Sequence, residues 1–298
     1  MTTTPQPLGF IGTGAMGIEM VLRLLAAGHP VVVSNRTRRN AAGAEEAGAR
    51  WAERPCEVAE QSRMVLSCLL NSDAVEEVYL GAGGLIETAR AGQVFVEHGT
   101  FSPRLAAEVH RRFADAGAAF VDMPVTGGPD GTREGRLAAM AGGSPEAITL
   151  AAEAASAYCA QITRVGAPGA GLQLKLVNQL LVSVHMVAAA EAVALLQALS
   201  IDLSAASSVL ERGWAGSAML SRAFSQLSTG ALHDTGVKIE GMIEIQELIA
   251  QLLDRPGDSP VFQASRSVFD RAISLGIGAD DPAALHRAVP GAVSEGRV

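Results

Sequence analysis

The chain has 298 residues, of which 48% are hydrophobic and 18% are charged, and its formal net charge is -8. This length exceeds a typical single core of about 100–150 residues, so two domains are expected. The negative charge would repel a phosphate backbone over most of the surface, so nucleic acid is not expected as a partner.

From Leu8 to about Gly166, short apolar runs rich in β-branched residues alternate with Ala-rich amphipathic segments. This alternation predicts an α/β domain over residues 1–166 with a doubly wound parallel sheet. The predicted strands are LGFIG, PVVVSN, RMVLSCLL, QVFVEHG and AAFVDMPV. The segment SPRLAAEVHRRFADAG predicts a helix that begins at Ser102 and Pro103 and ends at Gly117.

The alternation stops after Gly166, where GAPGAG would break regular structure. The remainder, residues 167–298, predicts an all-helical domain that begins with a long helix from about Ala170 to Leu199. Its apolar stretch, Leu180 to Leu203, carries polar groups such as Glu191. These are too many for a membrane span of about 20 apolar residues, so we expect a buried helix and no membrane.

The three cysteines, Cys56, Cys68 and Cys159, are odd in number and lack CxxC or His-paired spacing. Neither a disulfide framework nor a metal site is indicated. Cys68 lies in the apolar run MVLSCLL, which favours a buried core thiol over a nucleophile. The first ten residues lack a basic stretch followed by an apolar core, so no secretory signal is predicted. We expect a reducing, cytoplasmic setting.

A glycine motif, GFIGTGAMG, follows the first predicted strand and precedes an Ala/Leu-rich helix. Gly12 permits a tight turn, Gly14 lets a backbone approach a pyrophosphate, and Gly17 allows close packing of helix on strand. A glycine turn without a ligand is the alternative, but this placement favours a dinucleotide site. The predicted cofactor-binding residues here are Gly12, Thr13, Gly14, Ala15, Met16 and Gly17.

The end of the second predicted strand indicates which dinucleotide binds. An NAD site usually places Asp or Glu about 20 residues beyond the glycines, whereas an Arg there accommodates a 2′-phosphate. Residues 34–39 contain no acid and offer Asn35, Arg36 and Thr37 as contacts. Arg36 can stack on adenine or fork onto the phosphate, so we predict NADP, with NAD as the alternative. At least one of the next two arginines is expected only to solvate the start of a helix.

A later loop, DMPVTGG, offers groups for a small carboxylate-bearing substrate. The Thr126 hydroxyl and the backbone N–H groups of Gly127 and Gly128 could together bind a carboxylate. An ordinary glycine-rich loop is the alternative. Its position after a strand of an open α/β sheet, where ligands collect, favours the binding site.

Lys175 lies among apolar neighbours in GLQLKLVN, and Asn178 follows at i+3 on the same helical face. Desolvation would lower the pKa of Lys175 and make it a proton donor to a carbonyl oxygen during reduction, or an acceptor in reverse. A lysine that snorkels from an amphipathic helix is the alternative. A bound nicotinamide favours the catalytic role, because hydride transfer to a carbonyl needs a proton source nearby.

These segments, in this order, resemble the β-hydroxyacid dehydrogenase family over nearly the whole chain. The resemblance implies a Rossmann domain of the 6-phosphogluconate dehydrogenase type and an activity like that of 3-hydroxyisobutyrate dehydrogenase. It implies that Lys175 is the catalytic acid/base, that Asn178 holds substrate, and that the loop of Thr126, Gly127 and Gly128 binds its carboxylate. It also implies cofactor contacts at Leu69, Leu70, Asn71 and Thr100.

The chain departs from the family pattern at several positions. Thr126 stands where Ser is usual, and Gln179 stands where a second Asn is common. In EHGT, Gly99 lacks the hydroxyl of the usual acid-x-Ser-Thr. The family's Lys-Asp pair in the helical domain has no clear counterpart in VKIEGMIEIQEL, where Lys238 is the candidate substitute.

The leading hypothesis is an oxidoreductase that transfers a hydride between NADP(H) and a small β-hydroxyacid or semialdehyde. An imine reductase of the same architecture is the second hypothesis, which Lys175 and the carboxylate loop disfavour. A cofactor-binding scaffold without catalysis is the third, and the retained lysine disfavours it too. The long apolar helix exceeds what one small domain would bury, so a homodimer or homotetramer is predicted.

Overall fold

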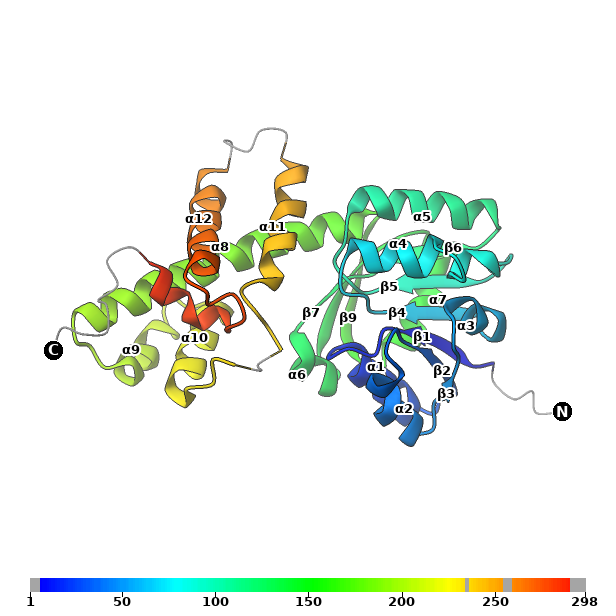
Figure 1. Cartoon of the computed structure of the whole chain (residues 1–298), viewed down its shortest axis with the longest axis horizontal. Helices are drawn as coiled ribbons and strands as arrows, with labels where there is room; N and C mark the ends of the chain where they lie inside the picture. The colour runs from blue at the N-terminus through cyan, green and yellow to red at the C-terminus, as the bar shows by residue number, and fades with distance from the viewer. Residues whose placement is uncertain (1–5, 234–235, 254–258, 290–298) are drawn as a thin grey trace. The chain divides into compact units, whose positions relative to one another are not determined.

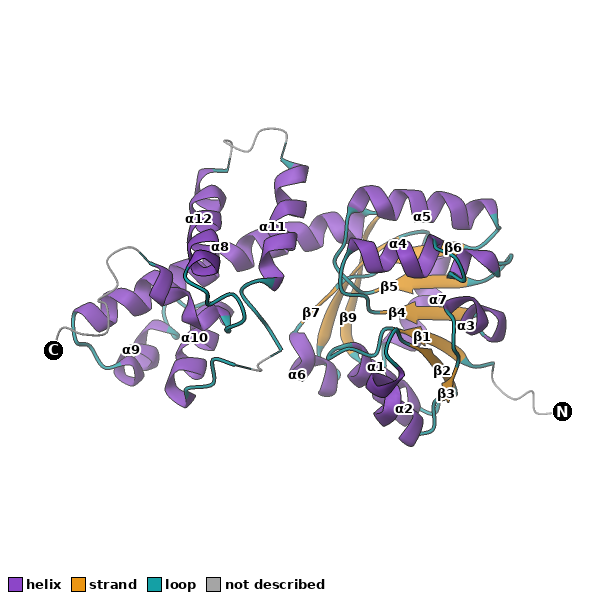
Figure 2. Ribbon diagram, in the orientation of Figure 1, coloured by secondary structure: helices purple, strands orange, loops and turns teal. Residues whose placement is uncertain are grey.

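The computed structural model describes residues 6–233, 236–253 and 259–289, and the chain divides into two compact units between Lys175 and Leu176. The first unit is a sheet with helices packed on it, and the second is a group of helices (Figure 1, Figure 2). The last strand ends at Gly166, and the first turns of the long helix α8 (Ala170–Ala198) belong to the first unit.

The first unit is built on one largely parallel sheet with strand order β3-β2-β1-β4-β5-β6-β8-β7, and β9 pairs with β8. The sheet confirms the predicted Rossmann-type α/β fold. The strands are β1 (Leu8–Ile11), β2 (Val31–Ser34), β3 (Arg50–Trp51), β4 (Met64–Ser67), β5 (Val94–Glu97), β6 (Ala119–Asp122), β7 (Val125–Thr126), β8 (Leu137–Gly142) and β9 (Cys159–Gly166).

Helices cover both faces of this sheet. The central strands are buried on both sides, which explains why they are continuous apolar runs rather than alternating ones. Residues of α1, α2 and α7 share one core cluster, and residues of α3, α4 and α5 share the other. The helices are α1 (Gly17–Ala26), η1 (Arg38–Ala41), α2 (Ala42–Glu46), α3 (Pro55–Gln61), α4 (Ser72–Leu80), η2 (Leu85–Glu87), α5 (Pro103–Asp115), α6 (Gly128–Arg133) and α7 (Pro145–Ala155).

Local signals fix the ends of α5 as predicted. Ser102 occupies the N-cap position and Pro103 the first turn, although the Ser102 side chain makes no capping hydrogen bond. Gly117 follows the helix with φ +73°, a backbone conformation that favours glycine and turns the chain into β6.

The sheet differs from the expected all-parallel arrangement at one edge. β8 runs antiparallel to β6 and β7, and only its pairing with β9 is parallel. Neither β8 nor β9 was predicted. The run LAAMAG in β8 contains no β-branched or aromatic residue, and most β9 residues are exposed, so neither segment carries the usual apolar signature of a strand.

The described part of the second unit contains helices and no strand, as predicted. Its core joins residues of α8, α11 and α12 to the C-terminal helix, with Phe269 and Leu285 fully buried. After α8, the helices are α9 (Leu203–Leu210), α10 (Ala218–Thr229), α11 (Gly241–Leu252), α12 (Pro260–Ser274) and η4 (Pro282–Ala288).

Helix α8, expected to be buried, is buried on one face only within the single chain. One face, with Val187 and Val193, packs into the helical unit, but the opposite face exposes apolar side chains by 40% to 60%. Among the described helices, it alone is long and apolar enough to cross a membrane, a property that core helices of soluble proteins share. The exposed residues of α8 are Leu174, Val177, Leu181 and Leu195, and Leu199, just after the helix, is also exposed.

Candidate functional site

The three motif glycines extend from the end of β1 to the first residue of α1 and lie in three different environments. Gly12 has φ +92°, and a Cβ there would lie 2.5 Å from the Cys68 carbonyl oxygen. A Cβ on Gly17 would lie 1.8 Å from the Gly12 carbonyl oxygen, so helix and strand approach too closely for any side chain. A Cβ on Gly14 would meet no described atom within 4 Å. Gly14 therefore leaves open space in which a ligand can reach the backbone.

The start of α1 carries polar groups that lack protein partners among the described residues. Met16 occupies the N-cap position without a capping side chain, and Gly14 and Ala15 are exposed. Thr13 is buried, and its Oγ1 has no hydrogen-bond partner in the described chain. A helix N-terminus with free N–H groups attracts phosphate. The loop therefore fits the pyrophosphate of a dinucleotide.

Asn35 connects this loop to the end of β2. Its Oδ1 accepts the Thr13 N–H at 3.1 Å, and its Nδ2 donates to the Thr37 carbonyl oxygen at 2.9 Å. One amide side chain thereby connects the turn after β1 to the turn after β2. Arg36 lies in the second turn, between Asn35 and Thr37. The sequence suggested Asn35 as a cofactor contact, and the structure also gives it this role in positioning the loop.

The arginines after β2 have different surroundings. Arg38 pairs with Glu45 at 2.8 Å between Nη2 and Oε2, and its guanidinium lies 5.2 Å from the centre of the Trp51 ring. Arg36 is exposed and has no ion pair with any residue in the described ranges. Arg36 is therefore free to meet a phosphate, whereas Arg38 is held against its own domain.

The loop after β4 holds three of the predicted cofactor contacts. The Leu69 N–H donates to Glu97 Oε1 at 3.0 Å, which fixes the start of the loop. Leu70 is 85% exposed, so its side chain is accessible to a ligand. Asn71 caps α4, where its Oδ1 accepts the Ala74 N–H at 3.0 Å.

Glu97, at the end of β5, organises the neighbouring strand ends and was not identified from the sequence. Its side chain is fully buried and accepts the Ser67 hydroxyl at 2.5 Å and the Gly99 N–H at 2.5 Å. Burial raises the pKa of Glu97, and these hydrogen bonds oppose the rise. A Cβ on Gly99 would lie 2.7 Å from Glu97 Oε1 and 2.3 Å from the Leu69 carbonyl oxygen. Gly99 is thus required here, and Thr100 follows it, partly exposed.

Two further groups lie at these strand ends, the buried His98 and the partly buried Cys68, and neither has a pKa suited to chemistry at neutral pH. His98 bonds the Met123 carbonyl oxygen and the Tyr158 hydroxyl, both at 2.8 Å, and burial lowers its pKa to about 4. It is therefore neutral at pH 7. Burial raises the pKa of Cys68 to about 12, which disfavours a nucleophilic thiolate.

The predicted carboxylate loop follows β6. Thr126 is partly buried at the end of β7, and Gly127 and Gly128 have φ +132° and +67°. A Cβ on Gly128 would meet no described atom within 4 Å, whereas one on Gly127 would lie 2.8 Å from Leu137 Cδ2. Gly128 therefore borders open space, and it lies beside the exposed Gly127 and the partly buried Thr126, a combination of groups that fits a carboxylate.

Lys175, on α8, is 8% exposed, and this desolvation lowers its pKa to about 8. No acid in the described ranges forms an ion pair with it. A snorkelling lysine would keep its ammonium group in water, so the burial favours the catalytic interpretation. Asn178 follows on the same helix, partly buried, and its Nδ2 donates to Gln179 Oε1 at 3.1 Å.

Asp122 joins the carboxylate loop to the helix that carries Lys175, a link that the sequence did not reveal. Its Oδ1 accepts the Gly169 N–H at 2.6 Å, and its Oδ2 accepts the Leu172 N–H at 2.9 Å. The only signal in the sequence was an acid at the end of an apolar strand, directly before the glycine loop.

In the helical unit, Lys238 lies in the turn before α11, exposed, with its Nζ 3.3 Å from Glu240 Oε1. It is therefore not a helical residue.

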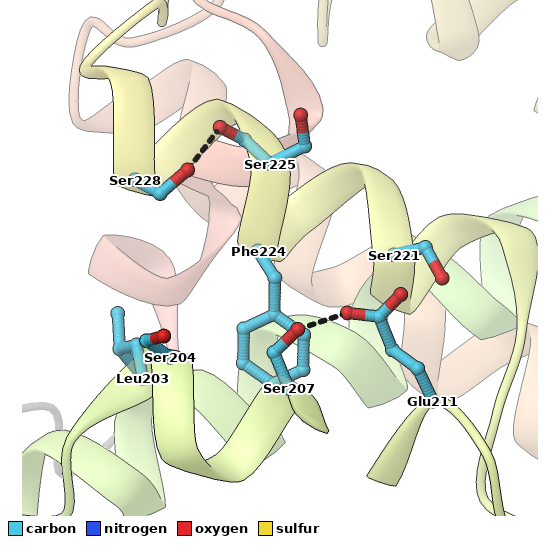
Figure 3. Close-up of a pocket in the computed structure, with 8 residues that line it drawn as sticks. All are labelled: Leu203, Ser204, Ser207, Glu211, Ser221, Phe224, Ser225 and Ser228. Carbon is cyan, nitrogen blue, oxygen red and sulfur yellow. Dashed lines mark hydrogen bonds between the residues drawn. The ribbon is translucent and has the colours of Figure 1, made fainter. Parts of the chain in front are cut away.

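A cavity of about 410 Å³ lies between α9 and α10 and contains none of the predicted site residues (Figure 3). The cavity is lined by Leu203, Ser204, Ser207, Glu211, Ser221, Phe224, Ser225 and Ser228.

In the described chain, no group of three or more His, Cys, Asp and Glu side chains could hold a metal ion.

Comparisons with known proteins match both units. Residues 7–166 match the family described as the NAD binding domain of 6-phosphogluconate dehydrogenase. Residues 169–289 match the family described as NAD-binding of NADP-dependent 3-hydroxyisobutyrate dehydrogenase. The L-threonate dehydrogenase of Cupriavidus necator is 30% identical over 294 residues, which cover 95% of this chain and 96% of that protein.

Solved structures agree. Psf3 in complex with NADP+ and 2-OPP gives a TM-score of 0.88 at 29% identity, over 94% of this chain and 99% of that one. The 3-hydroxyisobutyrate dehydrogenase of Salmonella typhimurium has the same fold, with a TM-score of 0.87 at 24% identity, over 96% of this chain and 100% of that one. Together these matches support NADP as cofactor, with NAD as the alternative.

Replacing Lys175 should stabilise the protein at neutral pH. Its pKa is about 8 when folded against 10.5 ordinarily, so the unfolded chain binds more protons between these values and stability rises with pH across that window. Lys175→Met should therefore raise the free energy of unfolding at pH 7 by about 1–3 kcal/mol, with a smaller gain at pH 10. Denaturant titrations at both pH values measure this, and Lys238→Met is the exposed control. An equal gain at both pH values would contradict a desolvated ammonium group.

Proposed function

We propose, because the chain belongs to the β-hydroxyacid dehydrogenase family, that it transfers a hydride between NADP(H) and a small β-hydroxyacid or semialdehyde. At the coarser level it is an NAD(P)-dependent oxidoreductase of the 3-hydroxyisobutyrate dehydrogenase type. The proposal adds the substrate class, the preference for NADP and the role of Lys175. A relative named for L-threonate supports a carboxylate-bearing substrate.

The observation that carries the proposal is the burial of Lys175. Of the 23 Lys and Arg residues, only Lys175 and Lys238 are lysines, so this chain uses arginine for nearly all of its cations. Arginine cannot give up a proton near neutral pH, whereas a buried lysine can. A lysine that is 8% exposed, with a pKa lowered to about 8, is suited to exchanging a proton in that range.

In the proposed mechanism, Lys175 Nζ donates a proton to the substrate oxygen during reduction of the carbonyl and accepts it during oxidation. The Thr126 hydroxyl and the N–H groups of Gly127 and Gly128 hold the carboxylate, and Asn178 orients the substrate. When bound, NADP(H) supplies the hydride chemistry. The glycine loop after β1 would hold its pyrophosphate.

A second copy of the chain is the proposed partner of the exposed face of α8. An exposed apolar face on a long helix usually marks a surface that another chain covers. Trp214, in the same unit, is also fully exposed. We therefore propose a homodimer or homotetramer assembled through α8. The free, buried or partly buried cysteines suit a reducing, cytoplasmic compartment, which is also proposed.

Lys175→Ala should lower kcat/KM by about 10²–10⁴-fold, since it removes the proton donor. Nucleotide oxidation with NADPH and NADH, against short semialdehydes, keto acids and cyclic imines, measures this, and Lys238→Ala is the matched control. Wild-type reduction should decline as pH rises through about 8, where Lys175 loses its proton. Turnover of imines alone would favour the imine reductase, and NADPH binding without any turnover would favour the scaffold. Full activity in Lys175→Ala would sink the proposed mechanism.

Arg36→Ala should weaken NADPH binding by about 10–100-fold and leave NADH binding nearly unchanged, because it removes charge-assisted hydrogen bonds to a 2′-phosphate. Calorimetric titration with both nucleotides gives the two affinities. Arg38→Ala is the matched control, since Arg38 is engaged with Glu45. If NADPH and NADH lose affinity equally, Arg36 does not select the phosphate.

The exposed face of α8 should carry the oligomer interface. Wild-type protein at micromolar concentration is expected to show the mass of two or four chains by light scattering. Leu181→Glu, at a position 50% exposed on α8, should shift the mass toward one chain, because the interface would bury an unpaired charge. Leu150→Glu, on α7 and 46% exposed, is the control. A monomeric wild type would overturn the proposal.

A further inference from the structure

Asp122 is a fully buried carboxylate that forms no ion pair with a described residue. Its two oxygens are used separately: Oδ1 accepts the Gly169 N–H at 2.6 Å, and Oδ2 accepts the Leu172 N–H at 2.9 Å. These donors flank the start of α8, where the N–H groups have no partner within the helix. The negative charge also lies at the positive end of the helix dipole.

The contact between β6 and α8 is too close for side chains. A Cβ on Gly171 would lie 2.6 Å from the Asp122 carbonyl oxygen and 2.4 Å from that of Met140. A Cβ on Gly142 would lie 2.5 Å from Asp122 Oδ1. The first turn of α8 is therefore seated directly on the ends of β6 and β8, with the Asp122 carboxylate enclosed between them.

This carboxylate fixes two functional segments at once. The strand that ends in Asp122 runs on into the loop of Thr126, Gly127 and Gly128. The helix turn that it holds ends at Leu172, and Lys175 follows one turn later on α8. All of these residues belong to the first unit.

We propose that Asp122 is a positioning residue, which holds the first turn of α8 against the end of β6 and so places Lys175 relative to the carboxylate loop. The inference rests on the proposed function of that lysine. Asp122 itself touches neither substrate nor cofactor in this role. Reacting groups that are misplaced by about 1 Å can lose about 100-fold in rate, so such an anchor has a measurable effect on turnover.

Both oxygens of Asp122 must accept for the anchor to work. An asparagine has one acceptor oxygen, so its NH₂ group would face the backbone N–H of either Gly169 or Leu172. Burial raises the pKa of Asp122 to about 6, while the backbone hydrogen bonds oppose this rise, so the carboxylate is ionised above that pH. Asp122→Asn therefore keeps the size of the side chain and removes one of the two anchoring bonds.

The test compares Asp122→Asn with Asp202→Asn. Asp202 also caps a helix, since its Oδ1 accepts the Ala205 N–H at 2.8 Å, but it lies at the surface of the helical unit. Protein labelled with ¹³C-lysine gives two Cε signals, because the chain has only two lysines. Their pH titrations report Lys175 directly, with the exposed Lys238 as an internal standard.

Asp122→Asn should move the titration of Lys175 from about 8 toward the ordinary 10.5, because a loosened helix start admits water to the ammonium group. It should lower kcat by about 100-fold with little change in the affinity for NADPH. Asp202→Asn should change neither. An unchanged Lys175 titration and kcat in folded Asp122→Asn would overturn the inference.

If Asp122→Asn does not fold, Asp122→Glu takes its place, because it keeps the charge and both acceptors but displaces them by one methylene. The same shift of the Lys175 signal is expected, and its absence overturns the inference. The NMR titration needs no substrate. If turnover by the wild type is absent or equals that of Lys175→Ala, the proposed function is contradicted. The NMR titration of the Asp122 variants still decides the role of Asp122.

Discussion

The candidate site depends on the cost of taking a charge out of water. The buried groups of the first unit include two acids at strand ends, Glu97 and Asp122, and one lysine at the start of α8, Lys175. The two carboxylates are compensated, because backbone N–H groups point at their oxygens. Lys175 has no such compensation among the described residues, and its proton is correspondingly loosely held. The two carboxylates therefore hold backbone segments in place, whereas Lys175 carries a proton that it can exchange near pH 8.

The position of the buried Glu97 carboxylate also explains a departure from the family pattern. Gly99 stands where the family usually has serine, so the chain lacks a hydroxyl at that position. In the structure, Glu97 Oε1 and the Leu69 carbonyl oxygen occupy the space that any Cβ at position 99 would need. The glutamate and the glycine are therefore one coupled feature of the strand end, and the hydroxyl of Ser67 is the one that bonds the carboxylate.

Sequence patterns predicted what rests on local chemistry. Apolar runs placed β1, β2, β4 and β5, and the glycine spacing placed the loop before α1, because a strand, a tight turn and a helix start each need particular residue types. The sequence could not reveal that the Asp122 carboxylate meets N–H groups about 50 residues later, since the pairing of a buried carboxylate depends on tertiary structure. The apolar length of α8 predicted more surface than one domain would bury, but the sequence did not indicate which face of the helix its own domain covers.

The glycine motif combines two kinds of residue that look alike in the sequence. Gly12 and Gly17 have no room for a Cβ, so the fold itself excludes replacements there. Gly14 has room for a Cβ within the fold, so a side chain at that position would clash only with a bound ligand. A descendant of this protein that no longer needed a nucleotide could therefore change Gly14 and still fold, while Gly12 and Gly17 persisted. The middle glycine of the motif would be lost first. A GxxxxG pattern in an intact sheet of this type would therefore indicate a protein whose ancestor bound a dinucleotide.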